Sequence, residues 1–237
     1  MLRLFLYVRT MNKRLEAIAE FVRDGRGLID VGTDHGYLPV RLAQRAYTGF
    51  LCASDINPGP LDAARRTARE ALLEDRIRFL LCDGLDDCPK ERIDTIVIAG
   101  MGGDLICRIL DRAEWCLDGA YSLILQPMTK AEVLRYWLVN NGFRLEEERL
   151  VRDGGRIYQI VFARFSANMP LSDAELFAGA FENIRDEALC REWLDALIRR
   201  FEKELQGLLS SAHPEEGREA ICRGVLAGLI EMKGKLT

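Results

Sequence analysis

Short apolar runs alternate with stretches of helical periodicity over the first two thirds of the chain. The apolar runs at residues 27–31, 49–55, 76–82, 94–99 and 121–128 predict buried strands. Apolar positions at helical spacing predict helices over residues 12–22, 40–46, 61–73, 105–110 and 130–140. Two further runs, 143–151 and 156–165, flank Gly154-Gly155 and predict a hairpin. This alternation predicts an α/β fold with a largely parallel sheet of about seven strands, one of them antiparallel.

Beyond residue 165 the pattern is helical throughout. Residues 166–170 read as a linker, followed by a helix over 173–184 and a long helix with an apolar stripe from Leu189 to Leu208. A third helix is expected from Pro214, with Ile221, Val225, Leu229 and Met232 on one face. The two long helices predict an antiparallel hairpin with an internal apolar seam. We therefore expect an α/β domain over 1–165 and a helical coiled-coil domain over 166–237.

Composition and charge narrow the class of protein. The chain has 237 residues, 49% hydrophobic and 30% charged, and the whole net charge of −4 falls in residues 166–237, which hold 9 Lys/Arg against 13 Asp/Glu. This balance does not favour a general nucleic-acid binder, so any RNA contact must come from a local basic patch. No apolar run approaches the ~20 residues of a membrane span.

Cysteine and histidine usage predicts no metal site and a reducing compartment. The seven cysteines form no C-x-x-C pair, and there are only two histidines. An odd number of cysteines scattered along the chain favours a cytoplasmic location. The apolar start is too short for a secretory signal, and either Met1 or Met11 fits as the first residue.

The stretch from Gly27 to Pro39 is the centre of the candidate site. A strand ends at Asp30, and Gly32 and Gly36 follow in a G-x-x-x-G spacing that opens a helix. A dinucleotide site needs G-x-G-x-x-G, and Asp34-His35 here would repel a pyrophosphate, which disfavours a nicotinamide oxidoreductase. A ligand carrying both an ammonium and a carboxylate, such as the methionine end of S-adenosylmethionine, fits better. An ordinary turn without a ligand is the alternative.

Acidic residues also end the next two strands. Asp55 lies 23 residues after Gly32 and is placed to accept hydrogen bonds from ribose hydroxyls, or to form an Asx turn before Pro58. Asp83, followed by Gly84, is placed to accept a hydrogen bond from an adenine amino group.

Three other features are candidates for substrate contacts. Gly100, Gly102 and Gly103 predict a glycine-rich turn after the fourth strand, where a flat substrate would lie against bare backbone. Lys13 and Arg14 begin a helix, either as solvated residues or as contacts to phosphate or to the cofactor carboxylate. Tyr37 offers an aromatic face for stacking, or packs in the core.

Several motifs together resemble a known family. They are D-x-G-x-D-H-G-Y-L-P at 30–39, D-I-N-P-G-P at 55–60, D-G-L at 83–85, I-A-G-M-G-G at 98–103 and L-I-L-Q-P at 123–127. From about Lys13 to Phe165 the chain resembles the bacterial tRNA adenine-N1 methyltransferases that act at position 22 (TrmK-like). It departs at Met128, where a polar residue such as asparagine is expected. That family also carries a helical coiled-coil hairpin at its C-terminal end.

The resemblance implies a class I, Rossmann-like methyltransferase fold and S-adenosyl-L-methionine as cofactor. It implies a cofactor site of Asp30, Gly32, Asp34, His35, Gly36, Asp55, Ile56, Asn57, Asp83, Gly84, Ala99 and Gly100. Asp34, His35, Gly100 and Met101 are the expected catalytic residues. The expected substrate contacts are Lys13, Arg14, Tyr37, Gly102, Gly103, Gln126 and Pro127.

The expected function is methyl transfer to N1 of an adenine in tRNA. The pocket motifs leave open a methyltransferase of another substrate, either a small molecule or a protein. A non-catalytic RNA-binding protein that keeps the cofactor fold is the other alternative. We expect tRNA as partner, no membrane association and a monomer, with a dimer left open.

Overall fold

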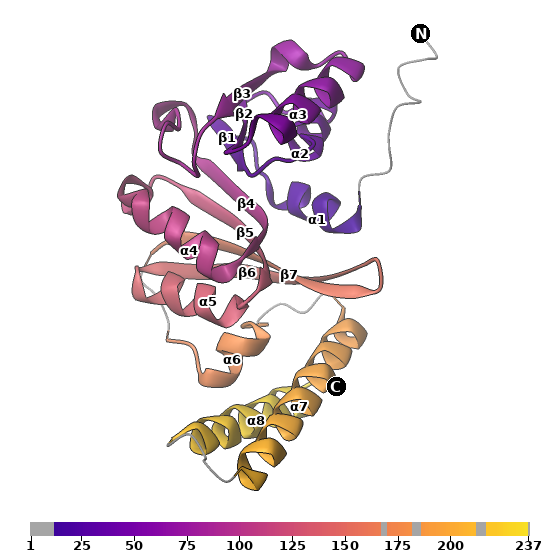
Figure 1. The fold of residues 1–237 in the computed structure, drawn as a ribbon, viewed down its shortest axis with the longest axis vertical. Helices are drawn as coiled ribbons and strands as arrows, with labels where there is room; N and C mark the ends of the chain where they lie inside the picture. Colours follow the sequence, from indigo (N-terminus) through magenta and orange to yellow (C-terminus); the bar gives the residue numbers. More distant parts are fainter. Residues whose placement is uncertain (1–11, 167–169, 182–185, 212–216, 237) are drawn as a thin grey trace.

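The computed structural model describes residues 12–166, 170–181, 186–211 and 217–236 and contains one seven-stranded sheet (Figure 1). The strands are β1 (Gly27–Val31), β2 (Phe50–Asp55), β3 (Ile77–Leu81), β4 (Thr95–Gly102), β5 (Ser122–Thr129), β6 (Phe143–Asp153) and β7 (Arg156–Phe165). Their order in the sheet is β3-β2-β1-β4-β5-β7-β6. Strands β1 to β5 pair in parallel, and β7 lies antiparallel to both β5 and β6. The prediction of about seven strands with one antiparallel member is confirmed.

Helices cover both faces of the sheet because successive strand residues point to opposite sides. Leu28, Leu51 and Val97 pack with α1 (Lys13–Phe21), α2 (Tyr37–Gln44) and α3 (Pro58–Glu70). Ile29 and Ile96 pack with α4 (Gly103–Arg112) and α5 (Ala131–Asn140) on the other face. Single 3-10 turns lie at Glu74–Arg76, Lys90–Arg92 and Glu114–Leu117.

Most helix boundaries lie within a few residues of those expected, and the differences have local causes. Helix α3 begins three residues early because Pro58, at its first position, has no N–H to lose. Asn12 caps α1 as predicted, since its side chain accepts a hydrogen bond from the Leu15 N–H at 2.9 Å.

The predicted glycine-rich turn after the fourth strand is wrong. Residues 100–102 continue β4, and register shifts at Met101 and Gly102 let the strand stay paired with β5 as far as Thr129. Gly100 has φ +83°, a conformation that glycine adopts without strain, and this produces the bulge. Helix α4 then begins at Gly103, two residues before the predicted Leu105.

The helical part consists of α6 (Asp173–Ala178), α7 (Glu187–Ser210) and α8 (Arg218–Gly234). Helices α7 and α8 lie side by side below the sheet (Figure 1) and enclose one apolar seam that includes Leu194, Leu197 and Phe201 of α7. The predicted face of α8 is partly wrong, because Ile221 is 49% exposed and Cys222 takes the buried position. Helix α6 ends at Ala178 rather than at 184, since Gly179 leaves the helix with φ +104°. Pro214 lies outside the described residues.

A buried ion pair joins the helical part to the sheet. Arg135 of α5 is fully buried and donates to Glu148 of β6 at 2.7 Å. Arg135 also donates to the Leu176 carbonyl, and the second oxygen of Glu148 accepts the Ala180 N–H. These bonds fix α6 against α5 and β6. Within the described residues no helix is long and apolar enough to cross a membrane.

Candidate functional site

The conformation and packing of the loop after β1 depend on two glycines. Gly32 and Gly36 have φ +71° and +68°, and Gly36 is the residue before the first turn of α2. A Cβ atom at Gly32 would overlap the Met101 methyl group, and one at Gly36 would lie 2.9 Å from Ala64 Cβ. The Gly32 N–H donates to the Ser54 carbonyl at 2.8 Å and ties the loop to β2. The loop therefore needs glycine at both positions, for conformation and for space.

Asp30 is a buried carboxyl group under this loop. It is 6% exposed and accepts a hydrogen bond from the Thr33 hydroxyl at 2.6 Å. Burial raises the pKa of Asp30 to about 6, the Thr33 hydrogen bond opposes that rise, and the charge of Asp55 adds to it. The structure therefore keeps a proton-sensitive group at the end of β1.

Asp55 is the last residue of β2, and its geometry is compatible with both predicted roles, the Asx turn and the ribose contact. Its Oδ1 accepts the Asn57 N–H at 2.9 Å, which is an Asx turn. Among the described residues, no hydrogen bond uses the other carboxylate oxygen of Asp55. Next to it, Ile56 is 58% exposed, and Asn57 precedes the first turn of α3. One acceptor oxygen and an apolar side chain are thus presented together.

Asp83 differs from Asp30 and Asp55 because its carboxylate forms an ion pair with Arg112. Arg112 of α4 donates to the Asp83 carboxylate at 2.9 Å and to the Asp83 carbonyl at 2.9 Å. That contact lowers the pKa of Asp83. Gly84, with φ +62°, packs against Ile109 of the same helix. The sequence did not indicate this pairing, since Asp83 and Arg112 are 29 residues apart.

The end of β4 lies between the glycine loop and β5. Met101 is partly buried, and its side chain lies on Gly32. Gly100 is exposed, whereas Gly103 is closed off by the Lys130 carbonyl, which a Cβ atom would overlap. Ala99 and Gly102 are partly buried between them. Only part of the predicted glycine surface is therefore accessible.

Arg14 reaches into the same region from α1. Its guanidinium donates to Gln126 Oε1, lies 5.5 Å from the Tyr158 ring centre and is 3.5 Å from the place of a Cβ atom at Gly100. Gln126 is fully buried, and its amide donates to the carbonyl of the buried Pro127 at 2.8 Å. The structure thus brings Arg14, Gln126 and Gly100 together, which the sequence did not indicate.

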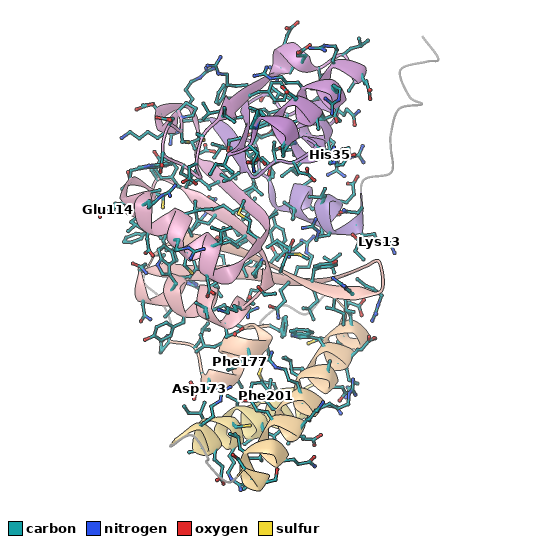
Figure 2. All side chains as sticks on the ribbon, in the orientation of Figure 1. Lys13, His35, Glu114, Asp173, Phe177 and Phe201 are labelled. Atoms are coloured by element: carbon teal, nitrogen blue, oxygen red, sulfur yellow. The ribbon has the colours of Figure 1, made fainter. Side chains whose placement is uncertain are left out.

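The remaining predicted residues lie at the rim. Asp34 has φ +53° and a side chain that is 72% exposed, 3.7 Å from the His35 imidazole. His35 stacks on Tyr37 with ring centres 5.3 Å apart. Lys13 is exposed at the start of α1, on the same side of the molecule as His35 (Figure 2).

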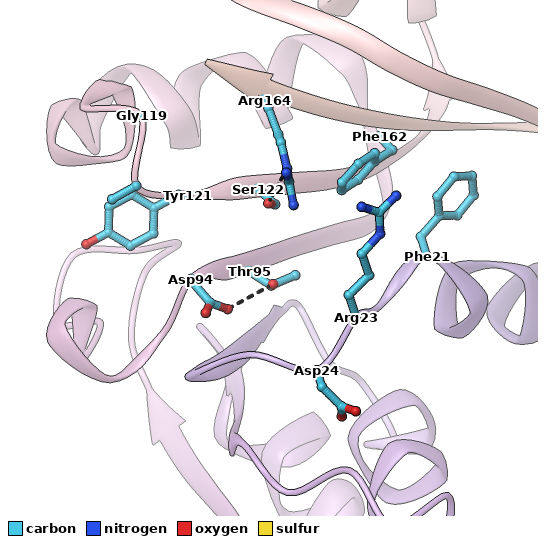
Figure 3. A pocket seen from close by; sticks show the side chains of 11 residues that line it. Phe21, Arg23, Asp24, Asp94, Thr95, Gly119, Tyr121, Ser122, Phe162 and Arg164 are labelled. Carbon is cyan, nitrogen blue, oxygen red and sulfur yellow. Dashed lines mark hydrogen bonds between the residues drawn. The ribbon is translucent and has the colours of Figure 1, made fainter. Parts of the chain in front are cut away.

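A separate pocket of about 300 Å³ lies at the opposite edge of the sheet, where β4 and β5 begin (Figure 3). Arg23 and Arg164 each lie 5.4 Å from the Phe162 ring, and Asp94 lines the pocket with Thr95. In parallel α/β sheets, ligands bind outside the carboxyl ends of the strands. The glycine loop, Asp55 and Gly100 are at that other edge, so the pocket of Figure 3 is separate from the candidate site.

The residues at the carboxyl ends of β1, β2 and β4 suit a nucleoside that carries an amino-acid tail. The glycine loop leads into the N-terminus of α2, where the helix dipole favours a carboxylate, and the Asp55 carboxylate at the end of β2 lies beside the exposed Ile56. Fold and site together define the class of S-adenosylmethionine-dependent methyltransferases.

Comparison with known proteins agrees with this class. The methyltransferase domain family matches residues 11–161. A Bacillus subtilis tRNA (adenine(22)-N(1))-methyltransferase is 35% identical over 153 residues, which are 65% of this chain and 64% of the relative. The matched part thus spans less than two thirds of that relative's length.

Solved structures extend the likeness to nearly the whole chain. A candidate tRNA (m1A22) methyltransferase of Streptococcus pneumoniae is 30% identical with a TM-score of 0.78, covering 95% of this chain and 99% of that one. The same protein has been solved with S-adenosyl-L-methionine (TM-score 0.73, 28% identity, covering 93% and 98%). The Bacillus subtilis m1A22 methyltransferase TrmK has a TM-score of 0.76 at 27% identity, covering 95% and 97%. The chain belongs to the methyltransferase domain family and, within it, to the TrmK-like proteins.

The described residues contain no group of three or more His, Cys, Asp and Glu side chains arranged to hold a metal ion. The absence of a metal from the complete protein stays a prediction.

Proposed function

We propose that this protein transfers a methyl group from S-adenosyl-L-methionine to N1 of an adenine, at position 22, in tRNA. The observation that carries the proposal is the meeting of three groups at one edge of the sheet: the glycine loop, Asp55 and the exposed Gly100. The names of the relatives support the choice of adenine N1 and position 22.

The proposed cofactor site uses the residues at the ends of three strands. Asp30, Gly32 and Gly36 hold the methionine part of the cofactor. Asp55 holds the ribose, and Ile56 lies on the side of the cofactor's adenine. Asp83 and Gly84 lie at the adenine end of the site. When bound, S-adenosylmethionine supplies an electrophilic methyl group on a positively charged sulfur.

The protein's own part is to orient the target base and to stabilise charge. Adenine N1 carries a lone pair at neutral pH, so no base is needed to activate it. Correct alignment alone contributes roughly 7–11 kcal/mol to such a step. N1 lies on the Watson–Crick edge, so the adenine must be unpaired and turned out before it reaches Gly100. The product gains a positive charge, and we assign its stabilisation to the exposed Asp34 carboxylate.

Arg14 and Gln126 form the side of the candidate site next to Gly100. The Arg14 guanidinium donates a hydrogen bond to Gln126 Oε1. This bond fixes the orientation of the Gln126 side chain beside Gly100. We assign both as positioning residues, with Tyr158 next to them. Lys13 is exposed at the start of α1, and we assign it a contact to a phosphate of the tRNA.

The test is transfer of labelled methyl from S-adenosylmethionine to bulk bacterial tRNA, followed by nucleoside analysis. The proposal predicts N1-methyladenosine as the labelled nucleoside. Cofactor binding in calorimetry without label in any RNA would point to another substrate or to a non-catalytic RNA-binding protein.

A further inference from the structure

A groove of about 450 Å³ lies between the carboxyl edge of the sheet and α7. Its lining includes Met128 at the end of β5, Arg156 and Tyr158 at the start of β7, and Trp193 and Arg200 of α7. The groove adjoins the candidate site, because its lining residue Tyr158 lies 5.5 Å from the Arg14 guanidinium, which donates a hydrogen bond to Gln126. Figure 1 shows two of the elements that line the groove, the β6–β7 hairpin and the first turns of α7, next to one another.

The charges of the groove favour an anionic occupant. Arg156 and Arg200 are exposed, and neither forms an ion pair with any residue that the structure describes. Lys130 also lines the groove but is paired with Asp104, and Glu132 is the one acid in the lining. Two guanidinium groups therefore remain available for phosphates, although the helical part of the chain is acidic overall.

The groove also presents aromatic side chains that are held in place. The Trp193 indole N–H donates to the Ala178 carbonyl at 3.1 Å, and this fixes the ring while leaving it partly exposed. Tyr158 is partly exposed as well, under the Arg14 guanidinium. Fixed aromatic rings beside arginines are the combination that binds single-stranded nucleic acid, through base stacking and phosphate contacts.

We propose that this groove binds the single-stranded RNA next to the target adenine. Phosphates contact Arg156 and Arg200, and a neighbouring base stacks on Tyr158. The inference rests on the proposed function, because a flipped adenine at Gly100 requires its neighbours to leave the helix nearby. It gives the acidic helical hairpin a substrate-binding role through one local basic and aromatic strip.

The first experiment is the double variant Arg156→Ala/Arg200→Ala, whose side chains are both exposed, so that the fold is kept. We expect KM for tRNA to rise about tenfold, with kcat within twofold and the Kd for S-adenosylmethionine unchanged. The slope of log K for tRNA against log salt should fall by about 1.4, since each lost phosphate contact on a single strand removes roughly 0.7.

A matched control removes two arginines elsewhere. Arg23 lies in the pocket of Figure 3, and Arg223 pairs with Glu219 on α8. The variant Arg23→Ala/Arg223→Ala should keep the wild-type KM and salt slope. If the double groove variant behaves like this control while the wild type methylates tRNA, the groove proposal is wrong. If the wild type itself transfers no methyl to tRNA, the proposed function fails instead.

Stacking is tested separately at Tyr158. Tyr158→Phe keeps the ring and should leave KM for tRNA near the wild-type value, whereas Tyr158→Ala should raise it about tenfold. Equal KM values for the two variants would contradict the stacking contact.

Discussion

The two edges of one sheet are built from the same strands but leave very different groups available. At the amino edge, local contacts use the polar groups: the Arg26 backbone N–H donates to Asp94 at 2.7 Å, the Arg76 side chain donates to the Tyr47 carbonyl, and the Arg92 guanidinium lies over the Phe50 ring. At the carboxyl edge Asp30 is buried with a raised pKa and Asp55 uses one oxygen in a turn.

The difference follows from chain direction. Helices begin after the carboxyl ends of parallel strands, so glycines, helix N-termini and strand-end acids collect there. The amino edge receives only the ends of helices and short connections. The buried or partly unused carboxyl groups do not stabilise the fold, and this marks the carboxyl edge as the functional one. Four substitutions test the difference between the two edges.

Asp30→Asn should have the largest effect, and the effect should be on stability. Because burial raises the pKa of Asp30 from its ordinary value of 3.8 to about 6 in the folded protein, ionising it costs the fold about 3 kcal/mol. The stabilisation given by the protonated form is lost as pH rises through about 6. Denaturant unfolding should show the variant more stable by about 3 kcal/mol near pH 8 and by under about 1 kcal/mol near pH 4. A difference that does not change with pH would refute this cost.

Asp55→Asn should weaken cofactor binding by about 2 kcal/mol, or roughly 30-fold in Kd. Asparagine keeps the oxygen that accepts the Asn57 N–H and replaces the second oxygen, so the turn survives while the ribose acceptor is lost. Calorimetric titration with S-adenosylmethionine measures the change. Asp24→Asn, in the pocket at the amino edge, is the control and should leave Kd unchanged.

Asp34→Ala should reduce turnover about tenfold through loss of charge stabilisation, with KM for tRNA within twofold. Its side chain is 72% exposed, so no buried contact is lost, but alanine at φ +53° should cost the fold about 1 kcal/mol, which denaturant unfolding checks. Steady-state kinetics with tRNA separate the two parameters. Wild-type turnover in a correctly folded variant would remove Asp34 from the mechanism.

Arg112→Leu should have the smallest effect, a two- to fourfold change in the Kd for the cofactor. It releases Asp83 from the pair that now orients it. Arg108→Leu, an exposed position on the same helix, is the control for removing a cation from α4. The same Kd in both variants would show that Asp83 does not depend on Arg112 for any role in binding.

The sequence predicted the parts of the site that depend on local order along the chain. The strand-end positions of Asp30 and Asp55 and the glycine loop follow from apolar runs and spacing, and these are local patterns. The partners that complete the site are distant in sequence: Arg14 reaches Gln126 across 112 residues, and Arg112 reaches Asp83 across 29. Sequence periodicity carries no information on such pairs.

Two of the wrong predictions of local structure have the same origin. Gly100 and Gly102 suggested a turn, but pairing with β5 keeps them in the strand through a bulge. Ile221 suggested a buried face of α8, but packing against α7 selects Cys222 instead. In both places tertiary contacts outweighed local preference.

The most direct test of the account compares two unmodified tRNA transcripts that differ only at position 22. The account predicts that the protein methylates the transcript with adenine at this position, yields N1-methyladenosine, and leaves the transcript with guanine unlabelled. Equal labelling of both transcripts, or label in a different nucleoside, would contradict it.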